Sequence, residues 1–169
     1  MIGFLKGTLI SKRPPELVVD VGGIGYELQA PMSTFYQLPE SGEPLTLLTH
    51  LLVREDAHAL YGFSTEAERV LFRNLLKVSG VGARIALGIL SGISVEGFRR
   101  CVLDRDLVTL TRIPGIGRKT AERLLVEMAD RVDQSGISDL EGKETTSGVK
   151  GEAHGALLAL GYRPAEVTR

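Results

Sequence analysis

The chain has 169 residues, of which 43% are hydrophobic and 24% are charged, as is usual for a soluble globular protein of one or two domains. Its formal net charge of −1 indicates no particular class of partner. Cys101 is the only cysteine, which excludes an intrachain disulfide and favours a reducing compartment; we expect a small buried side chain. Because no stretch resembles a signal peptide or a membrane span, the sequence predicts a cytoplasmic protein without a membrane partner.

The charge is distributed unevenly along the chain. Residues 63–132 carry 12 Lys and Arg against 8 Asp and Glu, whereas the segments before and after carry more acidic than basic side chains. A basic middle segment between acidic flanks is a pattern that can indicate an anion-binding surface.

The first 63 residues have the pattern of a small β-domain. Short strand-like runs are separated by turns at 12–15 and 22–25, which are rich in Pro and Gly. The expected strands cover residues 4–11, 16–21, 26–30, 43–53 and 58–63, and residues 33–39 are expected to form one short helix. Five short strands with such turns predict a small antiparallel barrel or sandwich.

From residue 64 the apolar spacing changes to the helical period. Ser64 or Thr65 can cap the first helix, and Ser94 and Asp104 are expected to cap two later ones. The later helices are expected at 83–90, 94–103, 104–110 and 118–131. The stripes predict an all-helical core over residues 64–131.

The last part of the chain changes composition again. Residues 132–150 have no apolar period and are rich in Gly and Ser, so we expect a flexible linker. Residues 151–169 predict one helix that ends at Gly161, followed by the first turn of another that begins near Pro164. One complete helix and the first turn of another cannot bury a core alone.

Two stretches repeat one pattern 35 residues apart: KVSGVGARIALGIL at 77–90 and RIPGIGRKTAERLL at 112–125. In each, Gly-x-Gly precedes a basic residue and an apolar-periodic helix. The glycines permit a sharp turn without obstructing side chains, and the next helix begins with free N–H groups and a positive dipole end. Such a turn binds phosphate and does not read bases. The candidate phosphate-binding residues are Gly80, Gly82, Arg84, Gly115, Gly117, Arg118, Lys119 and Arg123, with Arg123 four residues after Lys119 on one helix face.

A single Gly-x-Gly turn would favour a purely structural role, but two matching copies resemble the paired helix-hairpin-helix motif of DNA-binding proteins. Such a pair would grip the two backbones of one duplex across a minor groove. Some proteins with this motif are base-excision glycosylases, which need a catalytic Asp beyond the hairpin. Here the nearby acids lie within the following helix, the histidines lack metal-ligand spacing, and no P-loop is present. We therefore predict a DNA binder with no catalytic residue, no metal and no cofactor.

Most of the chain resembles the RuvA family of bacterial Holliday junction branch migration proteins. The resemblance rests on MIGFLKGTLISKRPPELVVDVGGIGYELQAPMSTFYQLPESGE, THLLVREDAHALYGF, SGVGARIALGILSG and IPGIGRKTAERLLVEM, covers about residues 1–131 and resumes at 152–169. It implies an α+β multidomain fold. The implied parts are an OB-like five-stranded barrel and oligomerisation domain (1–63), a tandem helix-hairpin-helix domain (64–131), a flexible linker (132–150) and a truncated three-helix ATPase-binding domain (151–169).

The resemblance also implies the partners. A homotetramer, or an octamer, would hold an open four-way DNA junction in recombination and repair while the hexameric ATPase RuvB moves DNA, and the resolvase RuvC is implied as a further partner. Glu55 and Asp56 match the family's acidic pin at the junction centre, with Arg54 as an adjacent junction contact. Binding of RuvB would involve Leu157, Leu158, Leu160 and Tyr162. A general duplex-binding or polymerase-clamp module and a helix-hairpin-helix nuclease or glycosylase stay open as alternatives.

Overall fold

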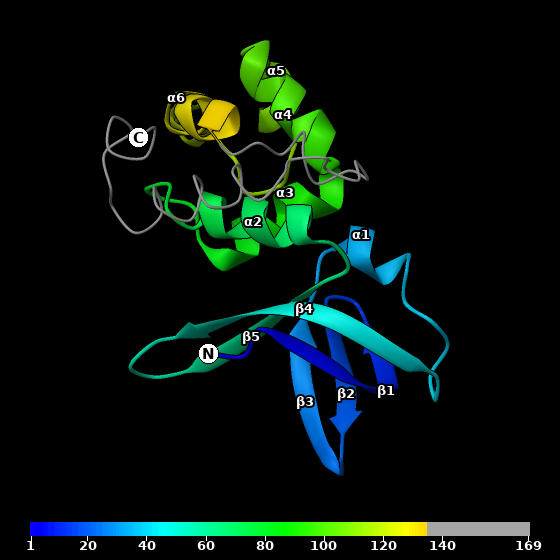
Figure 1. Cartoon of the computed structure of the whole chain (residues 1–169). Coiled ribbons are helices and arrows are strands. Elements are labelled where there is room, and N and C mark those ends of the chain that lie inside the picture. Colours follow the sequence, from blue (N-terminus) through cyan, green and yellow to red (C-terminus); the bar gives the residue numbers. More distant parts are fainter. Residues whose placement is uncertain (135–169) are drawn as a thin grey trace, which may run out of the picture. The chain divides into compact units, whose positions relative to one another are not determined.

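The computed structural model describes residues 1–134 (Figure 1). Residues 1–63 contain the strands β1 (Phe4–Arg13), β2 (Glu16–Val21), β3 (Ile24–Gln29), β4 (Pro44–Val53) and β5 (His58–Phe63), with a short helix α1 (Met32–Phe35) before β4. The helices α2 (Glu66–Leu75), α3 (Ala83–Gly92), α4 (Val95–Leu103), α5 (Leu107–Thr111) and α6 (Arg118–Gln134) follow. None of these helices has the length and hydropathy needed to cross a membrane.

The five strands close into a barrel in the order β1-β2-β3-β5-β4, which confirms the predicted five-stranded barrel. Neighbouring strands are antiparallel except β3 and β5, which are parallel and pair at Gln29 and Tyr61. Side chains that alternate along the strands form a largely aliphatic core, except that residues 60–63 of β5 are all buried. Its buried members are Leu5, Leu9, Leu17, Val19, Leu28, Ala30, Phe35, Leu47 and Leu60.

Strand β1 pairs with two neighbouring strands, β4 and β2. Its first half pairs with β4 and its second half with β2, and the register shifts between Leu9 and Ser11. A glycine is needed at the crowded position 7, because a Cβ on Gly7 would lie 2.1 Å from the carbonyl oxygen of Asp20. The strand continues to Arg13, two residues beyond the prediction, because residues 12 and 13 still pair with β2 and leave only Pro14 and Pro15 for the turn.

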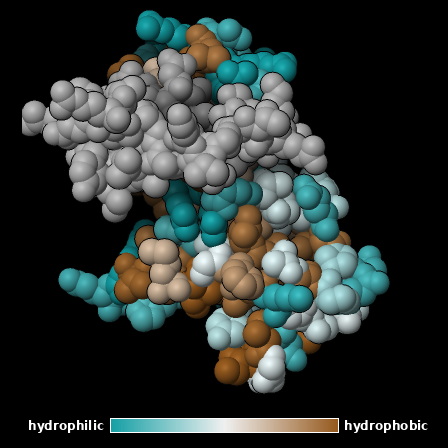
Figure 2. Space-filling model, viewed as in Figure 1, coloured by the Kyte–Doolittle hydropathy of each residue, from teal (hydrophilic) through white to brown (hydrophobic). Residues whose placement is uncertain are grey.

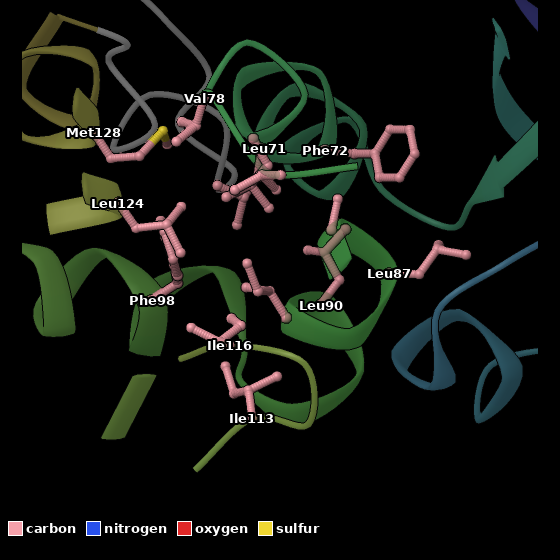
Figure 3. Close-up of a cluster of buried hydrophobic side chains, with 14 of the residues drawn as sticks. Leu71, Phe72, Val78, Leu87, Leu90, Phe98, Ile113, Ile116, Leu124 and Met128 are labelled. Carbon is pink, nitrogen blue, oxygen red and sulfur yellow. The ribbon is translucent and has the colours of Figure 1, made fainter. Parts of the chain in front are cut away.

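The helical part has its own core (Figure 3). Leu71 of α2, Phe98 of α4 and Leu124 of α6 point into one cluster with Ile113 and Ile116 from the second glycine turn. Cys101 is buried in this cluster, as predicted. The cluster also takes in Tyr61 and Phe63 of β5, whose ring centroids lie 4.9 and 5.0 Å from that of Phe72. The barrel and the helices are therefore in apolar contact along β5.

Helix α2 begins at a capping box. The Thr65 hydroxyl accepts a hydrogen bond from the Glu68 backbone N–H, and the Glu68 carboxylate accepts from the Thr65 backbone N–H. Glu68 is only 5% exposed, and its carboxylate also accepts from Ser64 and from the hydroxyls of Ser33 and Thr34 in α1. One buried carboxylate thus joins the barrel's short helix to the first helix after the barrel.

The predicted cap at Asp104 is wrong. Asp104 is the C-terminal cap of α4, and its backbone N–H donates to the Arg100 carbonyl oxygen. Arg105 then adopts a positive φ of 53°, which reverses the chain, and Asp106 caps α5 by accepting from the Thr109 backbone N–H at 3.0 Å. Both acids can cap a helix, and the reversal at Arg105 selects the second one.

Towards its C-terminal end, the described structure differs from the prediction in where the last helix ends. Helix α6 runs to Gln134, three residues into the predicted linker, and Gly136 is the first residue beyond position 131 with a strong helix-breaking tendency. The rest of the predicted linker and the predicted third domain, with Leu157, Leu158, Leu160 and Tyr162, lie outside the described residues.

Candidate nucleic-acid interface

The two glycine turns have the same backbone structure at positions 35 residues apart. The N–H of Val81 donates to the Val78 carbonyl oxygen at 3.0 Å, and the N–H of Ile116 donates to that of Ile113 at 3.1 Å. These four aliphatic side chains are buried and anchor both turns in the helical core. The sequence repeat is therefore a structural repeat.

The first glycine of each turn is required by the backbone. Gly80 has φ 85° and Gly115 has φ 88°, which lie in the left-handed region where a side chain is strained. Ser79 and Pro114 precede them at equivalent positions. Each turn can thus reverse the chain within a few residues and begin the next helix at once.

The second glycine of each turn is not required by the fold. Neither Gly82 nor Gly117 has a positive φ, and a Cβ at either position would meet no atom within 4 Å. The free space lies where the next helix begins, which is where a ligand would approach the backbone. Because glycine has no side chain, a phosphate group could approach the backbone more closely here than at a residue of any other type.

The helix that follows each turn begins with unpaired N–H groups. The first helical hydrogen bonds are those from Ala86 to Gly82 and from Ala121 to Gly117, both at 3.0 Å, so the N–H groups between them have no partner within the helix. No side chain caps α3, whose first turn also contains no acid. Both helix starts are consequently suited to hold an anion.

The predicted basic residues fall into two groups. Arg84 and Lys119 occupy equivalent positions, are exposed, and form no ion pair with a described residue. Arg118 is 81% exposed and forms an ion pair with Glu122, with 2.9 Å between Nε and Oε1. A pair this exposed is weak and can exchange for a phosphate.

Arg123 lies four residues after Lys119 in α6, as the sequence predicts, and it also reaches the first glycine turn. Its Nη1 donates to both the carbonyl oxygen and the hydroxyl of Ser79, each at 3.0 Å, and so joins α6 to the first turn. The sequence reasoning did not single out Ser79, because no local pattern indicates a partner 44 residues away. Arg123 fixes the two turns relative to each other, and its contact with phosphate stays a prediction.

The two predicted pin acids lie at the tip of the β4–β5 hairpin, which extends beyond the other strands (Figure 1). The backbone N–H of Arg54 donates to the Ala57 carbonyl oxygen at 2.9 Å and closes the loop around Glu55 and Asp56. Both acids are exposed, and neither forms an ion pair within the part of the chain that the structure describes. Over that same part, no cluster of three or more His, Cys, Asp or Glu residues could hold a metal ion.

A cavity of about 320 Å³ brings two of the predicted elements together. It lies between the β4–β5 hairpin and the first glycine turn, and both Arg54 and Arg84 line it. Tyr61 and Gln29 line it as well, although neither residue was predicted from the sequence to belong to a site. Their placement depends on barrel closure, which no local pattern reveals.

Comparison with known proteins adds a family assignment to this geometry. Residues 1–62 match the family described as RuvA N terminal domain, and residues 72–130 match the SAM-like Helix-hairpin-helix tandem family. A relative from Thioalkalivibrio sulfidiphilus is 54% identical over 176 residues, covering 100% of this chain and 88% of the relative. One from Methylococcus capsulatus is 55% identical over 174 residues, covering 98% of this chain and 86% of the relative. Both are named Holliday junction branch migration complex subunit RuvA. The chain belongs to the RuvA family.

Proposed function

We propose that this chain is the scaffold subunit that binds four-way DNA junctions for branch migration; its relatives are named Holliday junction branch migration complex subunits. The observation that carries the proposal is the repeated glycine turn, with equivalent hydrogen bonds and equivalent basic residues in both copies. Two such turns offer two phosphate sites in one rigid helical cluster. Because backbone N–H groups contact phosphate and not bases, binding would be independent of sequence.

The proposed roles of the two domains follow from the positions of their charged residues. Residues 64–131 would bind the DNA backbone, and Arg123 would hold the two turns together. The residues that would contact phosphate are Gly80, Gly82, Arg84, Gly115, Gly117, Arg118 and Lys119. Residues 1–63 would supply the central platform. Glu55 and Asp56 would repel phosphates at the crossing point, so that the junction is held open while the turns attract the arms further out.

The proposed assembly is a homotetramer around one junction, or an octamer of two such tetramers. Hydrophobic surface lies between hydrophilic areas over the barrel (Figure 2). The exposed large apolar residues on the barrel strands are Phe4, Ile10, Ile24 and Val53. Burial of such side chains between barrels would stabilise an oligomer.

The proposed partners beyond DNA are the ATPase RuvB and the resolvase RuvC. ATP hydrolysis for branch migration would be supplied by RuvB. Residues 151–169, with Leu157, Leu158, Leu160 and Tyr162, would contact RuvB, and the residues after α6 would connect them to the DNA-binding helices. A duplex-binding module and a nuclease or glycosylase are the competing functions.

A competition gel shift tests the proposal. A complex with a labelled four-way junction is challenged with an unlabelled junction or with linear duplex of the same arm sequences. We expect the junction to compete more than about tenfold better than duplex, a difference of about 1.4 kcal/mol in binding free energy. Equal competition would instead indicate a duplex-binding module, and strand cleavage or base release would indicate an enzyme.

The acidic hairpin gives a separate prediction. Replacing both acids (Glu55→Gln with Asp56→Asn) removes repulsion at the junction centre, so we expect equal or tighter junction binding and a junction-to-duplex preference reduced by roughly two- to tenfold. The control Glu16→Gln with Glu27→Gln removes the same charge from exposed positions on β2 and β3. Loss of junction binding by a folded acid-hairpin variant would disprove the repulsive role.

A further inference from the structure

The cavity between the β4–β5 hairpin and the first glycine turn is lined by more kinds of side chain than a phosphate site needs. Its volume is about 320 Å³, close to the lower limit for pockets that hold small organic molecules. Its lining includes the cations Arg54 and Arg84, and Gly82 at the start of α3. It also includes the apolar residues Leu52, Ala57 and Ala59 and the neutral polar residues Gln29 and Tyr61.

Tyr61 is the observation that points to a ligand. The residue is 6% exposed and its ring packs on Phe72, and no hydrogen bond joins its hydroxyl to a described residue. Among the described residues no buried polar side-chain atom lacks a partner, so this hydroxyl is not sealed off, and Tyr61 lines the cavity. A hydroxyl placed in this way is free to hydrogen-bond to a ligand. Burial raises the pKa of Tyr61, and the Arg54 guanidinium acts in the opposite direction, so the neutral phenol can donate or accept.

Gln29 stands beside Tyr61 because the two residues form the registered pair between the parallel strands β3 and β5. Its side-chain amide also has no hydrogen-bond partner among the described residues. An amide and a phenol both donate and accept hydrogen bonds. Side by side they can pair with the edge of any nucleobase, which suits a protein that does not read sequence.

We propose that this cavity binds one unpaired nucleotide of a junction strand at the branch point. Its phosphate lies against Arg54, Arg84 and the start of α3, and its base lies on the apolar wall with its edge toward Tyr61 and Gln29. The inference rests on the proposed function, since branch migration breaks base pairs at the crossing point before new ones form. The cavity adjoins the hairpin whose tip carries Glu55 and Asp56, so it lies where such a base would become free.

A double-mutant cycle that combines one substitution in the protein with one change in the DNA tests the proposal. Tyr61→Phe removes the hydroxyl and keeps the ring contact with Phe72. It is measured on an immobile four-way junction and on the same junction with abasic residues at its four branch-point positions. We expect Tyr61→Phe to weaken binding of the intact junction by about three- to tenfold and to leave binding of the abasic junction unchanged. Ala59→Leu, which fills the cavity without altering a charge, should show the same pattern.

Two controls complete the cycle. Tyr36→Phe removes a phenol hydroxyl from a residue that is 80% exposed and outside the cavity lining, and it should alter neither affinity. Abasic residues in the middle of the arms should leave the effect of Tyr61→Phe intact. Equal losses on intact and abasic junctions would overturn the proposal, because the hydroxyl would then contact the DNA backbone. No loss on either junction would overturn it too. Failure of the proposed function would appear differently, as a wild-type protein without preference for junctions.

Discussion

At the scale of single residues, the four turn glycines serve two different needs. Gly80 and Gly115 have backbone angles that other residues adopt only with strain. Gly82 and Gly117 have ordinary angles and open space around them, so the fold alone does not account for the absence of a side chain. Each turn therefore contains one glycine that the fold requires and one that we propose serves phosphate binding.

This difference gives a matched pair of substitutions in the second turn. Gly115→Ala should lower the free energy of unfolding by about 1–2 kcal/mol, because alanine is strained at a φ of 88°. Gly117→Ala should change it by less than about 1 kcal/mol but weaken junction binding about ten- to a hundredfold, by keeping a phosphate away from the helix start. Urea unfolding and fluorescence anisotropy measure the two effects. Unchanged junction affinity in Gly117→Ala would contradict the phosphate site.

Arg123 shows where sequence reasoning at this scale reaches its limit. The glycines and basic residues of each turn were predictable because their spacing is local. The partner of Arg123 depends on how the two turns pack in space. Its spacing from Lys119 indicates a shared helix face but does not indicate Ser79, which its guanidinium contacts. Tyr61 and Gln29 were missed for the same reason, since barrel closure brings them together.

At the scale of elements, strand and helix identities were predictable and several ends were not. The five strands and the later helices follow from apolar periods of two and of 3.6 residues. The ends of helices and strands depend on competing local signals, such as the two alternative capping acids before α5. Asp106, and not Asp104, accepts the capping hydrogen bond because Arg105 takes a left-handed conformation between them.

The corrected cap can be tested through stability. Asp106→Ala should lower the Tm by about 2–4 °C at neutral pH, whereas Asp104→Ala, the matched control, should have little effect. Hydrogen bonds from Thr109 lower the pKa of Asp106 below its ordinary 3.8. Since a lowered carboxyl pKa stabilises the fold only while the group is ionised, the deficit of Asp106→Ala should shrink as the pH falls below about 3.8. A larger loss in Asp104→Ala at neutral pH would restore the original assignment.

Glu68 couples two elements and supports a second stability prediction. Glu68→Ala leaves the donors of Ser33, Thr34, Ser64 and Thr65 without their shared acceptor, so we expect a loss of about 2–4 kcal/mol in unfolding free energy. Glu66→Ala removes a partly exposed ion pair from the same helical turn and should cost less than about 1 kcal/mol. Equal losses in urea unfolding would show that the Glu68 cluster adds nothing beyond a surface charge.

At the scale of the whole molecule, attraction and repulsion occupy different parts of the chain. The basic residues gather in the helical segment that holds the glycine turns, while the exposed acid pair projects from the barrel. A single linear duplex would need only the attractive part. The combination is explained if several copies surround a point where DNA arms meet, with acids at the centre and turns along the arms.

The mass of the complex with DNA tests this account most directly. Light scattering is measured on the protein mixed with one four-way junction, at two different arm lengths, and with linear duplex as the control. We predict four or eight chains of 18.3 kDa for each junction, with the same number at both arm lengths. A number of bound chains that grows with arm length, or one or two chains for each junction, would show ordinary duplex binding and contradict the account.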